Sequence, residues 1–352
     1  MLKYLIQRIL YGFAVLVGVV VVVFILFSVL PGDPARMTQG QRSDVSSLEA
    51  VRKELGLDKP TSVQFAYYIN DLSPISFHKN DSTNQAKYHY QKLINIGNEN
   101  YLVVKKPYLR RSYQTKKDVS QLLSETIPNT LVLASAAMLF AIIFGIGLGV
   151  LAAVYKNTWI DKVALSFSIL NISVPSFFAG IIIAYIFAFK LGPWTGLKMS
   201  GSLYNYNPFT GQVLSLKNLI LPALTLGLRP LSIIVQLTRS AMLEVLSMDY
   251  IRTARAKGLS KSKVIFKHAL KNALNPVITA VSGWFASLMA GAFFVEYIFG
   301  WNGLGKATVD ALELSDFPIV MGAVLFVALL FVIINILVDI IYGILDPRIR
   351  IE

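Results

Sequence analysis

Residues 300–310 read GWNGLGKATVD and reproduce the Gly-x-x-x-x-Gly-Lys frame of a nucleotide-binding P-loop. In such a loop, backbone N–H groups and the lysine hold phosphates, and a Ser or Thr after the lysine binds Mg²⁺. Here Ala307 follows Lys306, and the segment before the loop is a long apolar run rather than a buried strand. We therefore interpret the stretch as a glycine-rich turn between two helices, in which Trp301 belongs to an interfacial aromatic belt.

The sequence offers no other catalytic centre. It contains no cysteine, which excludes disulfides, thiolate metal sites and a cysteine nucleophile. The three histidines, His78, His89 and His268, form no His-x-x-x-His pair, and we expect each to be a surface residue. We also find no carboxylate pair suited to acid–base work. The sequence thus predicts no metal site, no cofactor and no enzyme activity in this chain.

Composition indicates a membrane protein. Hydrophobic residues make up 55% of the 352 residues, the mean hydropathy is +0.57, and only 15% of residues are charged, against about 25% in soluble domains. A span needs about 20 mostly apolar residues. Six stretches qualify: 9–30, 126–155, 163–189, 218–238, 272–295 and 317–338. The first is too long for the apolar core of a signal peptide, so we expect it to be retained as a helix.

The distribution of basic residues predicts the orientation. With the N-terminus inside, the short inner segments carry fourteen Lys and Arg residues and the short outer loops carry four. This asymmetry places both termini in the cytoplasm. The chain then divides into a cytoplasmic N-terminus and first span (1–30), an extracytoplasmic segment (31–125) and a core of five spans (126–352). The net charge of +13 is explained by the inner face and by segment 31–125, without a nucleic-acid partner.

The largest inner loop, residues 244–275, is the most informative stretch. Three basic residues crowd its first short helix: Arg252, Arg255 and Lys257. Gly258 can end that helix as a left-handed C-cap, and Ser260 can cap a second helix. The positive charge by itself is typical of the inner loops of membrane proteins and does not indicate a partner. The helix–Gly–helix pattern favours a compact knob that docks into another protein.

This loop resembles the coupling loop of ABC importer permeases, in the version found in dipeptide, oligopeptide and nickel permeases. The motifs that carry the resemblance are DYIRTARAKGLS at 249–260 and HALKNALNPV at 268–277. Where importers in general have Glu-Ala-Ala, Arg252, Thr253 and Ala254 stand here, a departure typical of the peptide subfamily. Further similar stretches are LPGDPA (30–35), IPNTLVLA (127–134), GIGLGVLAA (145–153), SVPSFF (173–178), LTRSAMLEVL (237–246), VEYIFGWNGLG (295–305), DFPIVMG (316–322) and LVDIIYGILDPRIR (337–350).

The resemblance implies an all-α integral membrane protein with six transmembrane helices and the type I ABC importer permease fold, in a bacterial inner membrane. It implies that a second homologous permease pairs with this chain, and that two cytoplasmic ABC ATPase subunits bind the ATP and Mg²⁺. It also implies an extracytoplasmic binding protein that delivers the substrate, most simply a di- or oligopeptide, with nickel or another small solute as the alternative. The ATPase-coupling residues would be Asp249, Tyr250, Arg252, Thr253, Ala254, Arg255, Ala256, Lys257 and Gly258.

Five residues could line the substrate path: Asn171, Ser173, Pro175, Arg229 and Glu296. Each has a plainer interpretation. The Asn and Ser could make helix–helix hydrogen bonds, and the proline could simply kink its span. Glu296, at the outer end of the fifth span, could contact the docked binding protein or peptide, or could be an interfacial charge in water. Arg229 lies mid-span, where lipid exposure is costly, so it should face a cavity or pair with an acidic or carbonyl group.

Two questions remain open at this level. Residues 73–108 lack the resemblance, and we expect an outer-face insertion in which 80–87 is a loop.

A secondary transporter is the rival class of protein. It would need intramembrane carboxylates or repeated halves. We find no clear repeat, and Asp339, the nearest candidate carboxylate, lies close to the cytoplasmic end of its span.

Overall fold

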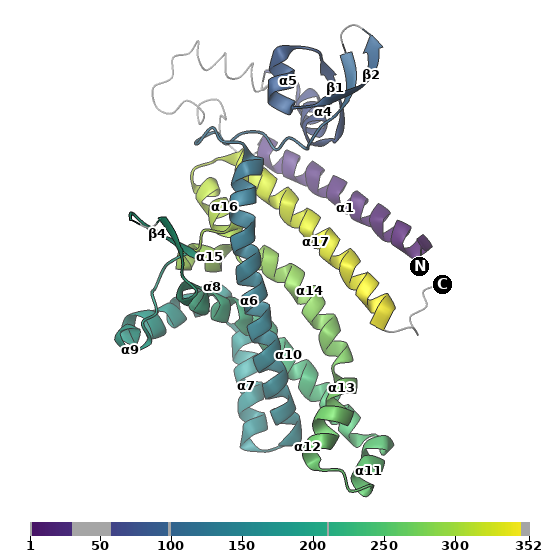
Figure 1. Cartoon of the computed structure of the whole chain (residues 1–352), viewed down its shortest axis with the longest axis vertical. Coiled ribbons are helices and arrows are strands. Elements are labelled where there is room, and N and C mark those ends of the chain that lie inside the picture. Colours follow the sequence, from purple (N-terminus) through teal and green to yellow (C-terminus); the bar gives the residue numbers. More distant parts are fainter. Residues whose placement is uncertain (1, 30–57, 98–99, 210, 346–352) are drawn as a thin grey trace. The chain divides into compact units, whose positions relative to one another are not determined.

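The computed structural model describes residues 2–29, 58–97, 100–209 and 211–345. Most of them are helical (Figure 1). The chain divides into two compact units. The first unit comprises Met1–Gly12, Thr126–Val309 and Leu329–Glu352, and the second comprises Phe13–Glu125 and Asp310–Ala328. The LPGDPA motif and the end of the last motif lie outside the described residues, so the expectations attached to them do too.

Among the described residues, four continuous helices are long and apolar enough to cross a membrane. They are α1 (Leu2–Val29), α6 (Val119–Val154), α10 (Lys217–Ser247) and α17 (Phe317–Leu345). Two bent pairs bring the number of candidate spans to 6. In one, α7 (Trp159–Ser173) is followed by α8 (Ser176–Ile183) and the π-helical η1 (Ala184–Lys190); in the other, α14 (Asn275–Gly291) is followed by α15 (Phe293–Phe299). All six predicted stretches therefore correspond to membrane-type helices.

The third stretch is not the straight span that hydropathy predicts, because α7 and α8 meet at an angle of 112°. The break falls at Val174, whose backbone is extended (φ −84°, ψ 128°). Pro175 follows, and a proline disfavours helical geometry in the residue before it. Two interpretations were offered for Pro175, a residue of the substrate path and a simple kink. The backbone at this position shows the kink.

Helix α10 is the centre of the first unit. It packs against α7, α8 and α14. It also lies very close to α6. A Cβ on Gly149 would be 2.6 Å from Thr238 Cβ, and one on Gly145 would be 2.8 Å from Ile234 Cγ2. These glycines allow the two helix backbones to approach, as small residues do in membrane proteins. Helix packing therefore accounts for the glycines of the 145–153 stretch.

Short elements complete the first unit. They are α9 (Gly192–Thr195), the hairpin of β4 (Tyr204–Asn207) and β5 (Gly211–Leu214), α11 (Asp249–Ala256), α12 (Lys261–Lys263), the π-helical η2 (Val264–Ala269), α13 (Leu270–Ala273) and the start of α16 (Leu304–Glu313). In Figure 1, α11 and α12 lie at the end of the unit where α6 and α7 meet.

The second unit contains a small α/β element that the sequence reading missed. Its parts are α4 (Thr61–Leu72), β1 (Ile75–Lys79), α5 (Ser82–Tyr88), β2 (Gln91–Gly97) and β3 (Asn100–Val104), with the strands antiparallel in the order β1-β3-β2. The expectation of a loop at 80–87 is wrong. The carboxylate of Asp81 accepts a hydrogen bond from the backbone N–H of Asn84 at 2.6 Å and caps α5, as Asp does at helix N-termini.

A buried polar cluster holds this element together. The Asp71 carboxylate accepts hydrogen bonds from the Tyr88 hydroxyl at 2.8 Å and from Arg110 Nε at 3.2 Å. The buried Lys105 ammonium donates to the backbone carbonyl of Asp71. His78 is only 7% exposed and stacks on Tyr90, with ring centroids 5.6 Å apart. The expectation that His78 is a surface residue is therefore wrong; the alternation of β1 turns its side chain inward.

Burial, followed by the nearby Lys105 charge, lowers the pKa of His78 below its ordinary value of about 6.5. The unfolded chain then binds a proton more readily than the folded one. The sheet element should be fully stable above about pH 6.5 and lose stability as pH falls below it, by about 1.4 kcal/mol for each unit by which the pKa is lowered.

Hydrogen exchange in the strands, corrected for the intrinsic pH dependence, can be compared at about pH 7.5 and about pH 5.5, one unit below the ordinary histidine pKa. The wild type should lose protection at the lower pH, and His78→Asn should lose less. His89→Asn, at an exposed histidine of the same element, is the matched control and should behave as the wild type. Equal protection of the wild type at both pH values would contradict the assignment.

Candidate functional site

The predicted coupling residues form an exposed helix held by two buried side chains. In α11, Ile251 is 0% exposed and Ala254 is 7% exposed. The other residues of the helix are exposed: Asp249, Tyr250, Arg252, Thr253, Arg255 and Ala256. The Asn272 amide donates to the Tyr250 hydroxyl at 2.7 Å. The helix thus presents a largely polar surface with two arginines and one aspartate, and it is fixed from one side only.

The turn after α11 has the conformation expected from the sequence. Gly258 has φ +76°, a left-handed conformation that side-chain-bearing residues adopt at a cost. A Cβ there would have no atom within 4 Å, so backbone conformation rather than space calls for glycine. The Ser260 hydroxyl accepts from the Lys263 N–H at 3.4 Å and caps α12. Both the C-cap and the N-cap predictions are confirmed.

An apolar cluster joins this knob, residues 249–273, to the ends of two long helices. Its buried members are Val150 and Ala153 of α6, Met242 and Val245 of α10, Ile251 and Ala254 of α11, Val264, Ile265 and Ala269 of η2, and Ala273 of α13. Because buried apolar contacts resist separation, the knob is attached to α6 and α10 together rather than hanging from a flexible loop.

A buried ion pair lies near the same ends of the helices. Asp161 of α7 accepts hydrogen bonds from Arg239 of α10, with Oδ1 2.5 Å from Nε and Oδ2 2.8 Å from the guanidinium Nη2. The Asn157 backbone N–H also donates to Asp161 at 2.9 Å. This bidentate pair fixes α7 and the preceding turn to α10. The sequence reading missed it, although Asp161 is the only acidic residue between the second and third predicted spans.

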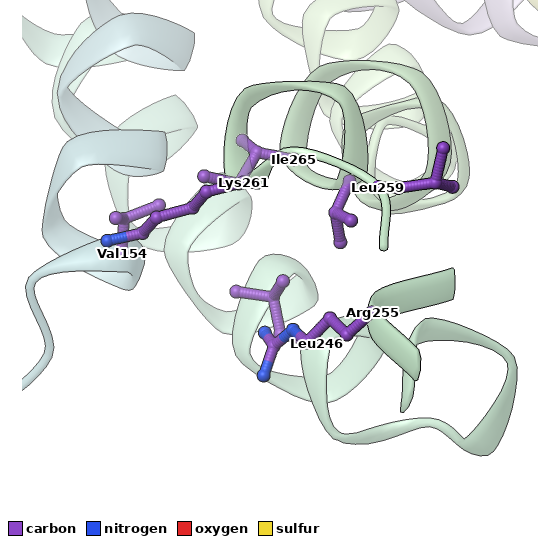
Figure 2. A pocket seen from close by; sticks show the side chains of 7 residues that line it. Val154, Leu246, Arg255, Leu259, Lys261 and Ile265 are labelled. Atoms are coloured by element: carbon purple, nitrogen blue, oxygen red, sulfur yellow. The ribbon is translucent and has the colours of Figure 1, made fainter. Parts of the chain in front are cut away.

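A pocket of about 370 Å³ opens beside α11. Figure 2 shows two cationic side chains, Arg255 and Lys261, at its border, with aliphatic side chains between them. The sequence did not predict this pocket, because its lining residues, which lie between Val154 and Ile265 in the chain, come together only in the folded structure.

Glu296, a predicted path residue, is 0% exposed. Its carboxylate accepts hydrogen bonds from the Thr130 hydroxyl at 2.6 Å, from the Gly305 N–H at 2.7 Å and from the Lys306 N–H at 3.1 Å. The Thr130 oxygen in turn accepts from the Leu304 N–H at 2.8 Å. The expectation of an interfacial charge in water is therefore wrong, and in this structure no surface of Glu296 is available to a peptide. Its carboxylate instead caps the N-terminus of α16, where unpaired N–H groups favour an anion.

The glycines of the P-loop-like stretch leave room for this carboxylate. A Cβ on Gly303 would lie 2.4 Å from the Glu296 oxygens, and one on Gly305 would lie 2.5 Å from Phe293 Cα. Trp301 is 0% exposed and donates from Nε1 to the Asn129 carbonyl at 3.0 Å. The assignment of Trp301 to an interfacial belt is therefore wrong, because its indole closes the core of this loop. The loop does cradle an anion, and the anion belongs to its own chain.

The other path residues do not form one site in the described structure. Asn171 and Ser173 donate back to carbonyls of their own helix, at Phe167 and Ile169, both at 2.9 Å. Arg229 of α10 is exposed and, among the described residues, has no hydrogen-bond or ion-pair partner. No group of three or more metal-ligating side chains is found in the described part of the chain.

The architecture defines a class of protein. The helices match the solved structure reported as "Inward facing conformations of the MetNI methionine ABC transporter", with a TM-score of 0.51 at 18% identity over 64% of this chain and 97% of the other. At that identity the match establishes the fold, which is that of a type I ABC importer permease.

Sequence comparison establishes the family. Residues 145–351 match the family described as "Binding-protein-dependent transport system inner membrane component", and residues 1–134 match its N-terminal counterpart. The glutathione transport system permease protein GsiC of Salmonella choleraesuis (strain SC-B67) is 35% identical over 350 residues, and that of Escherichia coli (strain K12) is 34% identical over 350 residues; each match covers 99% of both chains. The chain belongs to this family of inner-membrane importer permeases, whose members are transport subunits rather than enzymes.

Removing the Glu296 carboxylate should destabilise the protein. Glu296→Ala leaves the Thr130 hydroxyl and two N–H groups without their acceptor, at roughly 1–3 kcal/mol for each buried group left unsatisfied. Glu296→Gln keeps one carbonyl acceptor and should cost less. Lys306→Ala, which retains the backbone N–H, is the control. Thermal unfolding of the purified permease in detergent measures the three effects, and an unchanged midpoint for Glu296→Ala would contradict the capping role.

Proposed function

We propose that this chain is one half of the membrane channel of an ATP-driven peptide importer. Its knob, residues 249–273, docks on a separate cytoplasmic ATPase subunit, and a second homologous permease completes the channel. An extracytoplasmic binding protein delivers the substrate. The observation that carries this proposal is the exposed α11–Gly258 turn on a rigid apolar base, in a chain of the binding-protein-dependent importer family. Family membership also removes an ATP-independent transporter as the alternative.

The charge pattern supports the proposed orientation. Residues 239–271 carry eight Lys and Arg residues, which are Arg239 of α10 and seven residues of the knob. Basic residues of short loops are retained on the cytoplasmic side, which supports a cytoplasmic position for α11, beside the proposed ATPases. By the alternation of the spans, the α/β element of residues 61–104 and the β4–β5 hairpin both belong to segments that would be extracytoplasmic, where a binding protein can reach them.

A peptide is the substrate class that the residues favour. The relatives are named for glutathione transport, and glutathione is a tripeptide with free carboxylates. Arg229 is an exposed guanidinium near the middle of α10, and a guanidinium can hold a carboxylate bidentately. We infer that Arg229 faces the channel, where the Asn171 and Ser173 side chains near the α7–α8 break add polar groups and Pro175 follows the break itself. Nickel or another small solute is the alternative.

Gly258 tests the coupling role. Gly258→Val should strain the turn by roughly 1–2 kcal/mol and misplace α11, so substrate-stimulated ATP hydrolysis by the reconstituted complex should fall. Gly258→Asn is the matched control, because Asn tolerates the left-handed conformation and the space around Gly258 is open. Unchanged hydrolysis and transport in a fully assembled Gly258→Val complex would show that this turn does not couple.

Arg229 tests the substrate class. Arg229→Gln should reduce uptake of peptides with a free C-terminus, about tenfold for a lost charge-assisted interaction of about 1.4 kcal/mol, and should affect C-terminally amidated peptides less. Arg229→Lys keeps the charge but not the planar fork, so it should be intermediate. Equal loss for both kinds of peptide in a well-assembled complex would rule out carboxylate recognition. Poor assembly would instead assign Arg229 to the contact with the partner permease.

A further inference from the structure

The pocket beside α11 has a composition that no part of the proposed transport path explains. Its volume of about 370 Å³ is at the lower end of the range of ligand sites, about 300–1,000 Å³. Five aliphatic side chains line it, among them Leu246, Leu259 and Ile265, and within the described part of the chain its only charged lining residues are Arg255 and Lys261. It therefore offers an apolar interior with two cations at its border (Figure 2).

The position of the pocket restricts what can enter it. Arg255 comes from α11, and Leu259 follows the Gly258 turn, so the coupling surface itself forms one side. Val154 and Leu246 come from the ends of α6 and α10 and form another side. Any protein that covers the exposed face of α11 and its turn must also cover or enter this hollow.

The charges indicate the occupant's chemistry. Two cations border the pocket, and no acidic side chain of the residues that the structure describes lines it. An apolar group gains from filling the aliphatic interior, while a carboxylate beside it gains from Arg255 and Lys261. Buried anchors of this kind, flanked by complementary charges, are typical of the residues that dominate protein interfaces.

We propose that the pocket receives a side chain of the ATPase subunit: a large apolar residue, flanked by acidic residues that pair with Arg255 and Lys261. This inference rests on the proposed docking of the knob and adds a reciprocal contact to it. The permease helix contacts the ATPase, and the ATPase also inserts a side chain into the permease. Such an anchor would join the motion of the ATPase to α6 and α10 directly, as well as through α11.

Charge reversal tests the acidic half of the contact. Lys261→Glu should weaken binding of the ATPase subunits to the permease about tenfold or more, as close interfacial charge pairs do. Lys263→Glu is the matched control: it is exposed, lies two residues away and does not line the pocket, so its effect should be clearly smaller. Lys261→Arg should preserve binding. Equal effects of the two reversals would show only a general preference for positive charge and would overturn the proposal.

Cysteine labelling tests insertion, and the chain has no native cysteine to interfere. Leu259→Cys reports on the pocket, Thr253→Cys on the exposed face of α11, and Lys198→Cys on a remote exposed position. In the permease alone, a maleimide should modify all three. In the complex with the ATPase, positions 253 and 259 should be protected and position 198 should not.

The outcomes separate the two levels of the argument. Protection at 253 with full labelling at 259 leaves the docking intact and overturns the inserted side chain. Full labelling at 253 in an assembled complex overturns the docking and the inference together. Protection at 259 without the ATPase, in vesicles of phosphatidylglycerol but not of phosphatidylcholine, would assign the pocket to an anionic lipid and also overturn the proposal.

Discussion

A charge or backbone group that leaves water inside a membrane protein must find its partners within the protein. Much of this structure follows from that constraint. Glu296, which is 0% exposed, receives three donors and so ties α6, α15 and the start of α16 together. Asp161 and Arg239 satisfy each other and tie α7 to α10. Because removing one member of such a set leaves the others unpaired at high cost, these contacts fix which helices are neighbours.

Close packing at glycines extends this connectivity to the knob. Gly145 and Gly149 bring α6 against α10 at distances that no other residue would allow without displacement. The ends of the same two helices contribute to the apolar cluster beneath α11. A force applied to α11 therefore acts on α6 and α10 as one body, and on α7 through the Asp161–Arg239 pair. The α7–α8 break at Val174 lies beyond this body, where the helix is already interrupted.

The sequence predicted what local patterns determine. Six apolar stretches, the Gly258 turn and the Ser260 cap depend on composition and backbone preference over a few residues, and the structure confirms them. The sequence could not predict features that depend on partners distant in the chain. His78 was expected at the surface and Trp301 in an interfacial belt, because nothing beside them in sequence indicates burial. In three dimensions the Tyr88 and Tyr90 rings pack on His78, and the buried Trp301 indole donates to the Asn129 carbonyl. The pocket beside α11 likewise joins residues from five separate elements, α6, α10, α11, α12 and η2.

The P-loop-like stretch binds an anion as a P-loop does, but the anion is a carboxylate of the same chain and not a nucleotide. Glycines, a helix N-terminus and free N–H groups make an anion site whether the anion is a phosphate or a carboxylate. In this chain Glu296 supplies the anion, and its oxygens occupy the space over Gly303 and Gly305 that a phosphate would need. A nucleotide would have to displace a buried carboxylate that already satisfies the loop's donors, and would then meet its negative charge. The resident carboxylate therefore excludes a phosphate more strongly than the missing Mg²⁺ ligand at Ala307 does.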